Sequence, residues 1–518
     1  MSHKAKALMI LGTASDVGKS VIAAGLCRIF YRAGIRVAPF KAQNMSLNSY
    51  VTLDCGEIGW AQAAQAAACG IEPTVDMNPI LLKPVAGLRS QVIVQGKVYG
   101  DMPSRDYYRA KWEIWQKVKE SYARLAREFD LIVLEGAGGA AEINLREHDL
   151  ANLRIAKLAN AEVLLVGDIE RGGVFASLIG TIELLKPDER RRIKGIIINK
   201  FRGDKDLLKS GLDFLERRTG IPVLGVVSYY EELRIPEEDS VALERRKREE
   251  KSFSPRTINI AVIALPHMAN YTDFAELEKE PGVSLRYLTR REDLSKADVV
   301  ILPGTKNTLG DLEWVWTEGW AKEILCYAKG GGKVTGICGG YQILGEEVTD
   351  PLELEDKRKK GKGLGLLPVR TRLEREKITE RVAARYQLNG SNGVLEAYEI
   401  HMGRSTVGEP ASPAFRIVKR FRKTVRETDG AATRDGRVWG TYLHGIFADP
   451  DFRRSWLEGL FKNKGISHPS PSPSKGEGRG EGPSGLRDPY DAWANYLWKQ
   501  LDIERIFKLA GIKNSEAL

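Results

Sequence analysis

The sequence predicts an α/β protein of two domains, each a parallel sheet covered by helices. Three observations support this prediction. The chain has 518 residues, which is more than one hydrophobic core usually organises. Short apolar runs alternate with helical patterns along most of the chain, as is typical of βαβ units. A charged stretch at 244–256 interrupts this alternation, so we expect the two domains to meet there.

Six apolar runs in the first half are the predicted strands of the first sheet. They are Leu8–Leu11, Val37–Phe40, Leu131–Leu134, Val163–Val166, Ile196–Ile198 and Val223–Val227. Beyond the charged stretch, Ile258–Leu265 and Val299–Leu302 begin the second alternation. The predicted domains are therefore 1–243 and 257–450, joined by a linker at 244–256.

The last part of the chain, 451–518, is a predicted extension with two contrasting segments. Residues 468–485 are rich in Pro, Ser and Gly and hold nothing that fills a core, so we expect this insert to be disordered. After it, Asp488-Pro489 predicts the start of a terminal helix that docks on a domain. The apolar residues expected to share one face of that helix are Trp493, Leu497, Leu501 and Ile506.

Composition and charge exclude several classes of protein. The composition is 42% hydrophobic and 29% charged, and no apolar run approaches the roughly 20 residues of a membrane span. Five cysteines, an odd number without metal-ligand spacing, argue against a disulfide framework or a zinc site. The net charge of +10 lies largely in mixed-sign stretches without an aromatic stacking motif, so an anionic small substrate fits better than nucleic acid. We expect a cytoplasmic protein without a membrane partner.

A phosphate-binding loop follows the first predicted strand. The run from Leu8 to Ser20 reads strand, glycine-containing loop, then helix, and in that context backbone N–H groups and a helix N-terminus bind phosphate. Lys19 would hold the outer phosphates of ATP, and Ser20 would bind the accompanying Mg²⁺. The predicted nucleotide-binding residues here are Gly12, Thr13, Asp16, Val17, Gly18, Lys19 and Ser20.

Other polar residues would complete this nucleotide site. Glu135 ends a buried-looking strand and precedes Gly-Ala-Gly-Gly, which lets a phosphate ligand approach the backbone. It is the first candidate metal ligand, and Glu57 is the second. Lys41 would meet the transferred phosphate, and Asn199 would read the nucleotide base. For each side chain the alternative is a surface charge or a strand-end turn.

A cysteine module lies in the second half of the chain. Cys338 follows a short apolar strand and precedes two glycines and a helical pattern, which is the arrangement of a nucleophile elbow. His444, at the end of another apolar run, is the predicted base. Backbone groups at Gly304 and Gly339 would bind glutamine and the developing oxyanion. These parts together predict acyl transfer from an amide.

Three long stretches indicate a particular family. They are residues 39–50, 75–84 and 398–403, which read PFKAQNMSLNSY, VDMNPILLKP and YEIHMG. Together with the two motifs, they make the chain outside the insert resemble the cobyric acid synthases, glutamine-hydrolysing enzymes of vitamin B12 biosynthesis in the cobyrinate/cobyrate amidotransferase family. The N-terminal half is similar to dethiobiotin synthetase-like P-loop proteins, and the C-terminal half to class I glutamine amidotransferases.

The resemblance implies an ATP- and L-glutamine-dependent ligase acting on a corrinoid substrate. It would amidate four peripheral carboxylates of adenosylcobyrinic acid a,c-diamide to give adenosylcobyric acid. Candidate substrate-binding residues are Gln43, Asn44, Asn48 and His401. The oligomeric state stays open.

Two positions depart from the family pattern. Class I amidotransferases usually carry an acidic residue two positions after the catalytic histidine, but Ile446 stands there. The third member of a catalytic triad is therefore unassigned. Trp60 stands where the family pattern has arginine, which affects phosphate or substrate binding if that arginine touches either.

Two other functions compete with this interpretation. A cobyrinic acid a,c-diamide synthase would use the same chemistry on different carboxylates, and the stretch 43–48 favours the cobyric enzymes. A nucleotide-switched scaffold of the partitioning-ATPase kind would make no amide. Cys338 and His444 argue against such a scaffold.

Overall fold

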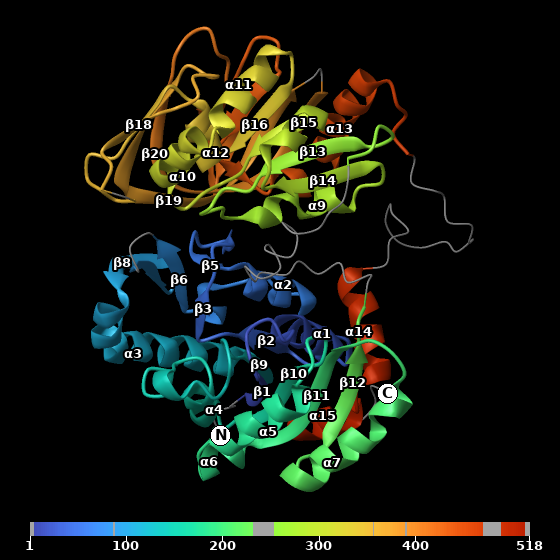
Figure 1. Ribbon diagram of the computed structural model, residues 1–518. Coiled ribbons are helices and arrows are strands. Elements are labelled where there is room, and N and C mark those ends of the chain that lie inside the picture. Colours follow the sequence, from blue (N-terminus) through green and yellow to red (C-terminus); the bar gives the residue numbers. More distant parts are fainter. Residues whose placement is uncertain are drawn as a thin grey trace.

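The computed structural model describes residues 5–85, 89–230, 253–355, 357–388, 391–469 and 488–512. Most of the expected linker at 244–256 and of the expected insert at 468–485 lies outside these ranges. The first domain and the second domain stack on each other, the first below and the second above in Figure 1. Both contain the predicted parallel sheet.

The first domain is built on a six-stranded parallel sheet in the order β12-β11-β10-β1-β9-β2. Its strands are β1 (Lys6–Gly12), β2 (Val37–Phe40), β9 (Leu131–Glu135), β10 (Glu162–Asp168), β11 (Ile193–Phe201) and β12 (Val223–Ser228). All six predicted strands are thereby confirmed. They were visible as apolar runs because a parallel sheet between helices buries both faces of its strands.

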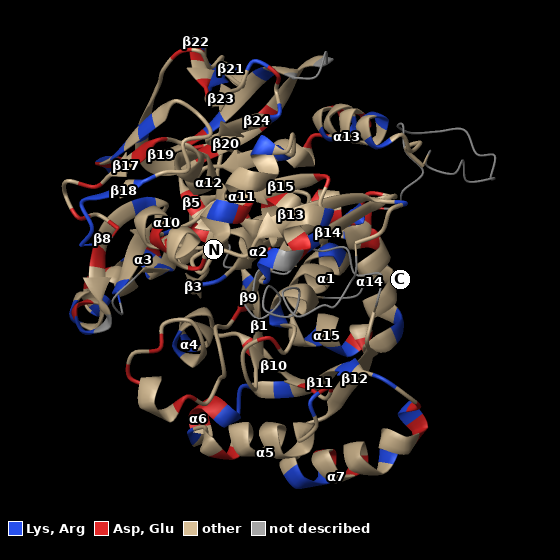
Figure 2. Cartoon of the chain, turned by 45° about the horizontal axis from the view of Figure 1, so that its top comes forward, with Lys and Arg blue, Asp and Glu red and all other residues tan. Residues whose placement is uncertain are grey.

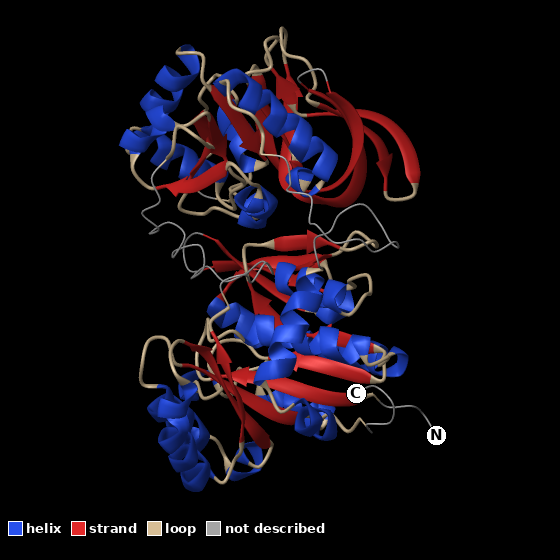
Figure 3. Cartoon of the chain, turned by 90° about the vertical axis from the view of Figure 1, so that its right-hand side faces the viewer, coloured by secondary structure: helices blue, strands red, loops and turns tan. Residues whose placement is uncertain are grey.

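Helices cover both faces of this sheet, as Figure 3 shows. They are α1 (Lys19–Arg32), α2 (Trp60–Ala68), α3 (Ser104–Glu128), α4 (Leu153–Ala159), α5 (Val174–Leu184), α6 (Pro187–Arg190) and α7 (Lys209–Thr219), with short 3₁₀ turns at Val75–Met77, Ile143–Leu145 and Lys205–Leu208. Leu8 and Ile10 of β1 pack in one core with α1, whereas Met9 and Leu11 pack in the core on the other face. This alternation follows from the two-residue period of a strand.

A smaller set of strands lies between the main sheet of the first domain and the second domain (Figure 1). A four-stranded sheet has the order β3-β6-β7-β8, and β4 pairs with β5. These strands are β3 (Gln43–Met45), β4 (Ser49–Val51), β5 (Glu57–Gly59), β6 (Ile80–Val85), β7 (Arg89–Val94) and β8 (Lys97–Pro103). The sequence did not predict them, because several are only three residues long and mix polar with apolar side chains.

The second domain has a sheet in the order β14-β13-β15-β16-β24-β23, parallel except for its last pair. Its strands are β13 (Ile258–Ile263), β14 (Val283–Leu288), β15 (Val299–Leu302), β16 (Lys333–Ile337), β23 (Ala431–Ala432) and β24 (Val438–Thr441). The two strands predicted here, at Ile258–Leu265 and Val299–Leu302, are confirmed. The helices are α9 (Ala275–Lys279), α10 (Thr308–Thr317), α11 (Trp320–Lys329), α12 (Gly339–Leu344) and α13 (Pro450–Lys464), with 3₁₀ turns at Tyr271–Phe274, Arg291–Lys296 and Ile446–Ala448.

A second, mostly antiparallel sheet completes this domain. Its seven strands are β17 (Glu347–Thr349), β18 (Lys360–Lys362), β19 (Val369–Leu388), β20 (Ser391–Val407), β21 (Phe415–Arg420), β22 (Lys423–Asp429) and β25 (Leu443–His444). The long strands β19 and β20 contact β4 of the first domain. This sheet therefore reaches the small strands between the domains.

The C-terminal segment returns to the first domain. α14 (Pro489–Gln500) and α15 (Ile503–Leu509) lie beside α1 and β12 (Figure 1). The expectation of one continuous helix is wrong, because Leu501 is extended and bridges to Gly225 of β12, and Asp502 then caps α15. The four predicted apolar residues still pack in one core cluster.

Basic and acidic residues are interspersed along the helices, strands and loops of the chain in Figure 2. In the ranges that the structure describes, no helix is both long and apolar enough to cross a membrane.

Candidate functional site

The phosphate loop connects β1 to α1 in the way the sequence predicts. Gly18 precedes α1 with a φ of 96°, and a Cβ there would lie 2.1 Å from Nδ2 of Asn199, so only glycine fits. Asn199 Nδ2 donates to the Val17 carbonyl at 2.9 Å. The backbone N–H of Thr13 donates to Val166. Asn199, expected at the nucleotide base, thus holds the loop in its turn.

Positively charged groups also contact the loop backbone. Lys19 Nζ donates to the carbonyls of Ala14 and Gly138 at 2.8 and 2.9 Å. Lys200 Nζ donates to the Asp16 carbonyl at 2.6 Å. Lys19 is thereby held between the two glycine-containing loops that follow β1 and β9, which is where the outer phosphates of a nucleotide would lie.

Glu135 is the centre of a buried polar cluster at the start of α1. Its carboxylate accepts from Ser20 Oγ at 2.7 Å, Lys41 Nζ at 2.8 Å and Gln65 Nε2 at 2.6 Å. Burial opposes ionisation of Glu135, but the charge of Lys41 and these hydrogen bonds outweigh it, so the pKa of Glu135 is lowered. The structure therefore brings together four of the predicted site residues: Lys19, Ser20, Lys41 and Glu135.

The donor atoms in this cluster fit a magnesium ion. A hydroxyl and an ionised carboxylate lie within hydrogen-bond distance of each other beside the phosphate loop, and Mg²⁺ prefers such oxygen ligands. Among the described residues, no group of three His, Cys, Asp or Glu side chains is placed to hold a metal. A site with few protein ligands is typical of Mg²⁺, which usually takes its other ligands from phosphates and water.

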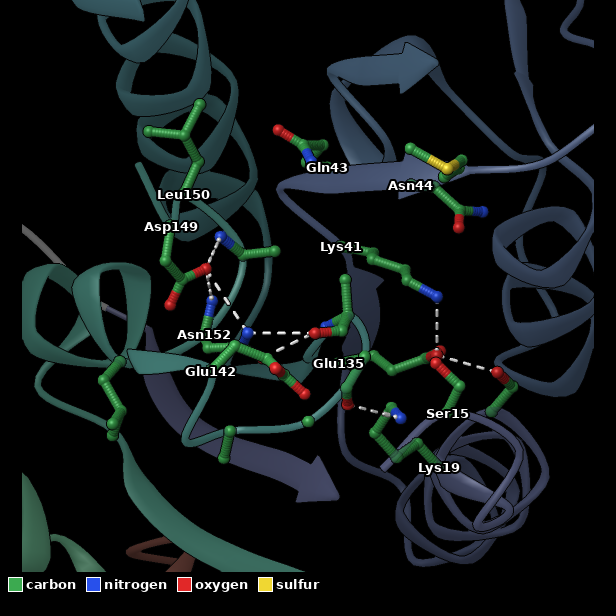
Figure 4. Close-up of a pocket in the computed structure, with 18 of the residues that line it drawn as sticks. Ser15, Lys19, Lys41, Gln43, Asn44, Glu135, Glu142, Asp149, Leu150 and Asn152 are labelled. Atoms are coloured by element: carbon green, nitrogen blue, oxygen red, sulfur yellow. Dashed lines mark hydrogen bonds and ion pairs between the residues drawn. The ribbon is translucent and has the colours of Figure 1, made fainter. Parts of the chain in front are cut away.

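A cavity of about 1290 Å³ opens beside the loop, and we refer to it as the large cavity. Figure 4 shows Lys41 pointing toward Glu135 above Lys19, with Gln43 and Asn44 of β3 on one side and Asp149, Leu150 and Asn152 on the other. Gln43 and Asn44 both line it, as expected for substrate residues. Asn48, which was grouped with them, is instead buried where the two domains meet.

Glu57, the second candidate metal ligand, does not join the Glu135 cluster. Its carboxylate accepts from Ser49 Oγ and Lys83 Nζ, both at 2.8 Å, and from Lys377 Nζ of the second domain. Burial opposes ionisation of Glu57, but the two ammonium groups outweigh it and lower its pKa. Since both oxygens already pair with lysines, the structure assigns Glu57 to the domain interface and not to the metal.

Cys338 has the backbone of a nucleophile elbow between β16 and α12. Its φ and ψ of 50° and −109° are unusual for a residue with a side chain, and such strain is typical of a nucleophile held on a tight turn. A Cβ on Gly340 would lie 1.9 Å from the Leu302 carbonyl, so this turn requires glycine. The thiol is buried and points toward the Ile400 carbonyl at 3.6 Å.

His444 lies beside Cys338, and an acidic residue holds it in place. Nδ1 of His444 is 2.7 Å from Oδ2 of Asp273, and Oδ1 of Asp273 accepts from the Gly445 N–H at 2.9 Å. Both side chains are only 2% exposed. Burial disfavours the charged imidazole, but Asp273 and then Cys338 raise the pKa of His444 to about 10. Sequence reasoning missed Asp273, which completes a Cys-His-Asp arrangement.

The remaining residues of this module surround a small cavity, which we refer to as the Cys338 cavity. Gly304 and Gly339 line it with Cys338 and His444, as the oxyanion prediction requires. A Cβ on Gly304 would lie 3.3 Å from Cε1 of His444. His401, a candidate for corrinoid binding, also lines this cavity and stacks on Tyr442. The structure thus separates His401 from Gln43 and Asn44.

Comparison with known proteins agrees with both sites. Residues 8–242 match the model of the CobQ/CobB/MinD/ParA nucleotide binding domain, and residues 259–452 match the CobB/CobQ-like glutamine amidotransferase domain. A cobyric acid synthase of Syntrophobacter fumaroxidans is 47% identical over 99% of this chain and 100% of its own length. The chain belongs to the cobyric acid synthase family. Two further cobyric acid synthases, from Moorella thermoacetica and Sorangium cellulosum, are 50% and 46% identical over 89% and 98% of this chain and over 90% and 98% of their own lengths.

Membership of the cobyric acid synthase family makes the chain a glutamine-hydrolysing ligase with an ATP-binding domain and a glutamine amidotransferase domain. The fold class predicted from the sequence is confirmed in both halves. The position that the cobyric acid synthase pattern fills with arginine, Trp60, begins α2 and packs edge-on against Tyr50. It does not line the large cavity.

Proposed function

We propose that this chain amidates four peripheral carboxylates of adenosylcobyrinic acid a,c-diamide, using ATP and L-glutamine, to give adenosylcobyric acid. The proposal is supported chiefly by the presence, in one chain, of a phosphate loop facing a large cavity and a Cys-His-Asp arrangement beside a second cavity. The full-length similarity to cobyric acid synthases favours this substrate over the carboxylates of a cobyrinic acid a,c-diamide synthase.

The first half of the reaction would activate a carboxylate. A substrate carboxylate oxygen attacks the γ-phosphorus of ATP, ADP leaves, and an acyl phosphate forms. Lys19 lies where it would hold the outer phosphates, and Lys41, paired to Glu135 at 2.8 Å, would face the transferred group. Mg²⁺ held by Ser20 and Glu135 would neutralise phosphate charge. Gln43 and Asn44 would hold the corrinoid on the far side of the cavity.

The second half would release ammonia from glutamine. The Cys338 thiolate attacks the side-chain amide carbon, and the oxyanion lies toward the backbone of Gly304 and Gly339. His444, held by Asp273, gives a proton to the departing ammonia. Water then attacks the thioester and releases glutamate. Ammonia reaches the acyl phosphate, the amide forms and phosphate leaves.

Each segment of the chain has a role in this proposed reaction. Residues 1–243 would be the synthetase domain and 257–450 the amidotransferase domain, joined by 244–256. The segment 451–518 would serve both, because α13 packs in the core of the second domain and α14 in that of the first. All five cysteines are free thiols, which supports a reducing, cytoplasmic location.

The division of labour is tested with two variants of the full chain. Cys338→Ala should lose amidation with glutamine but keep it with ammonium chloride, because only ammonia release is removed. Lys19→Ala should lose amidation with either nitrogen source and keep glutamine hydrolysis. Loss of both nitrogen sources in a folded Cys338→Ala protein would contradict the assignment.

A further inference from the structure

The small four-stranded sheet forms a wall between the two cavities. Leu82 of β6 and Ser90 of β7 line the large cavity, whereas the next residue along β6, Lys83, lines the Cys338 cavity. Gln91 of β7 accepts from Lys377 of the second domain at 3.1 Å. Adjacent residues of a strand point to opposite faces. Ammonia made at Cys338 therefore meets one face of this sheet while its target lies on the other.

The wall ends at β3, which is an edge strand. Asn44 on β3 lines the large cavity, and its Nδ2 donates to Oε1 of Gln62 at 3.1 Å. Gln62 lies on α2, so this helix contacts the edge through that hydrogen bond, and the side chain of Gln62 is fully buried. The edge of the wall is thus lined by the amide groups of Asn44 and Gln62.

Gln62 and a second glutamine of α2, Gln65, each have one side-chain amide atom without a hydrogen-bond partner. Nε2 of Gln62 and Oε1 of Gln65 are buried and make no hydrogen bond, although both residues are 1% exposed or less. Such atoms are rare because each costs about 1–3 kcal/mol of desolvation. Gln62 and Gln65 are three residues apart, so they share one face of α2. Ammonia, with one lone pair and three N–H groups, satisfies a free donor and a free acceptor.

Polar contacts lead from the Cys338 cavity to Ser49 at the domain interface. Nδ2 of Asn270 lies 3.4 Å from both ring nitrogens of His444, and its Oδ1 accepts from the Ser49 N–H at 2.9 Å. Ser49 pairs with Gly59 at the end of β5, and α2 begins at the next residue. Ser49 therefore lies at the domain interface. Its strand partner Gly59 precedes Gln62 by three residues.

The surroundings of Ser49 favour neutral ammonia over the ammonium ion. Lys83 and Lys377 flank the carboxylate of Glu57, and both lysines line the Cys338 cavity together with Lys306 and Glu355. The positive charge of the lysines disfavours an ammonium ion at this place. Burial acts in the same direction, because it disfavours any charged amine and lowers the pKa of Lys377 to about 7. Val51, Tyr398 and Ile400 form a buried apolar cluster across the domain interface. Such a cluster excludes water from the contact between the two domains.

We propose that ammonia travels from the Cys338 cavity to the large cavity around the β3 edge of the wall, past Ser49, Gln62 and Asn44. This route rests on the proposed division of labour between Cys338 and the phosphate loop. The amide groups of Gln62 and Gln65 serve as its relay, and Gln65 delivers ammonia beside Glu135, to which its own Nε2 is bonded at 2.6 Å.

The route is tested by the ratio of glutamate released to amide formed in the full chain with glutamine, ATP, Mg²⁺ and the diamide corrinoid. Gln62→Met keeps the length of the side chain but removes its polar atoms. We expect this ratio to rise about tenfold, equivalent to about 1.4 kcal/mol in the barrier to passage. Amidation with ammonium chloride should stay at the wild-type rate, because external ammonia enters through the open large cavity.

A second variant and a matched control keep the test decisive. Gln62→Glu keeps the shape of the side chain and places there a carboxyl group that retains ammonia as ammonium, so it should raise the ratio as well. Gln95→Met removes a glutamine in the turn between β7 and β8 that donates to Ser121 of α3 at 3.0 Å, and should leave the ratio unchanged.

The outcomes separate the route from the proposed function. An unchanged ratio in either folded Gln62 variant overturns the route, and so does loss of amidation with ammonium chloride in both, because Gln62 would then act in synthesis itself. If wild-type protein forms no amide with either glutamine or ammonium chloride, the proposed function fails and the route fails with it.

Discussion

Replacement of Asp273 by asparagine tests whether His444 depends on an acidic partner. The carboxylate oxygen lies 2.7 Å from Nδ1 of His444, and both side chains are 2% exposed. Asparagine keeps the shape but removes the charge. It should leave the imidazole in place and remove the main interaction that favours its protonated form.

The size of the effect follows from the pKa of His444. Burial lowers it, yet Asp273 and Cys338 raise it from its ordinary value of 6.5 to about 10, which corresponds to about 5 kcal/mol in favour of the imidazolium. If Asp273 accounts for about half of this free energy, its loss raises the activation barrier of glutamine hydrolysis by about 2–3 kcal/mol. The reaction should then be roughly 30- to 150-fold slower. Because the raised pKa falls back toward 6.5, the loss of activity at high pH should move to lower pH.

Glutamate release measured from pH 6 to 10 checks both expectations. Amidation with ammonium chloride should be unaffected, since the phosphate loop is untouched. Asp298→Asn is a matched control in the same domain, because Asp298 bonds to the Asn259 N–H and to Lys464 away from Cys338. A rate within twofold of wild type, with an unshifted pH profile, would refute the assignment of Asp273.

Three further changes test other parts of the account. Glu135→Gln removes the buried negative charge that pairs with Lys41 at 2.8 Å. It should destabilise the first domain by about 3–5 kcal/mol and stop amidation from either nitrogen source; retained synthesis would exclude Glu135 as a metal ligand. Gly304→Ala places a methyl group 3.3 Å from His444 and should slow glutamate release by about tenfold; a wild-type rate would argue against an oxyanion site there. Trp493→Ala removes a buried side chain that donates to the Val21 carbonyl and should lower the free energy of unfolding by about 3–5 kcal/mol in denaturant titration; a loss under about 1 kcal/mol would mean that α14 adds little stability.

Local features of the chain were predictable from the sequence. The strands of the first sheet are apolar runs because helices cover both faces, and the phosphate loop and the turn at Cys338 are recognisable because each needs glycine beside a functional residue. Both motifs are contiguous in sequence. Their geometry is therefore decided by a few neighbouring residues.

Features that depend on contacts between distant residues were not predictable. Asp273 is 171 positions from His444, and nothing in its local sequence marks it as a partner. Glu57 looked like a metal ligand, but Lys377, 320 positions away, pairs with it across the interface. The sheet of β3, β6, β7 and β8 was missed because its short strands gain stability from packing between the domains and not from a strong apolar pattern.

The most direct test of the central claim is the mass of the product. Purified protein would be incubated with adenosylcobyrinic acid a,c-diamide, ATP, Mg²⁺ and glutamine, and the corrinoid would be analysed by mass spectrometry. The account predicts stepwise conversion of four carboxyl groups to amides, with glutamate and ADP formed alongside. An unchanged corrinoid mass, from folded protein that still hydrolyses glutamine, would contradict the proposed function.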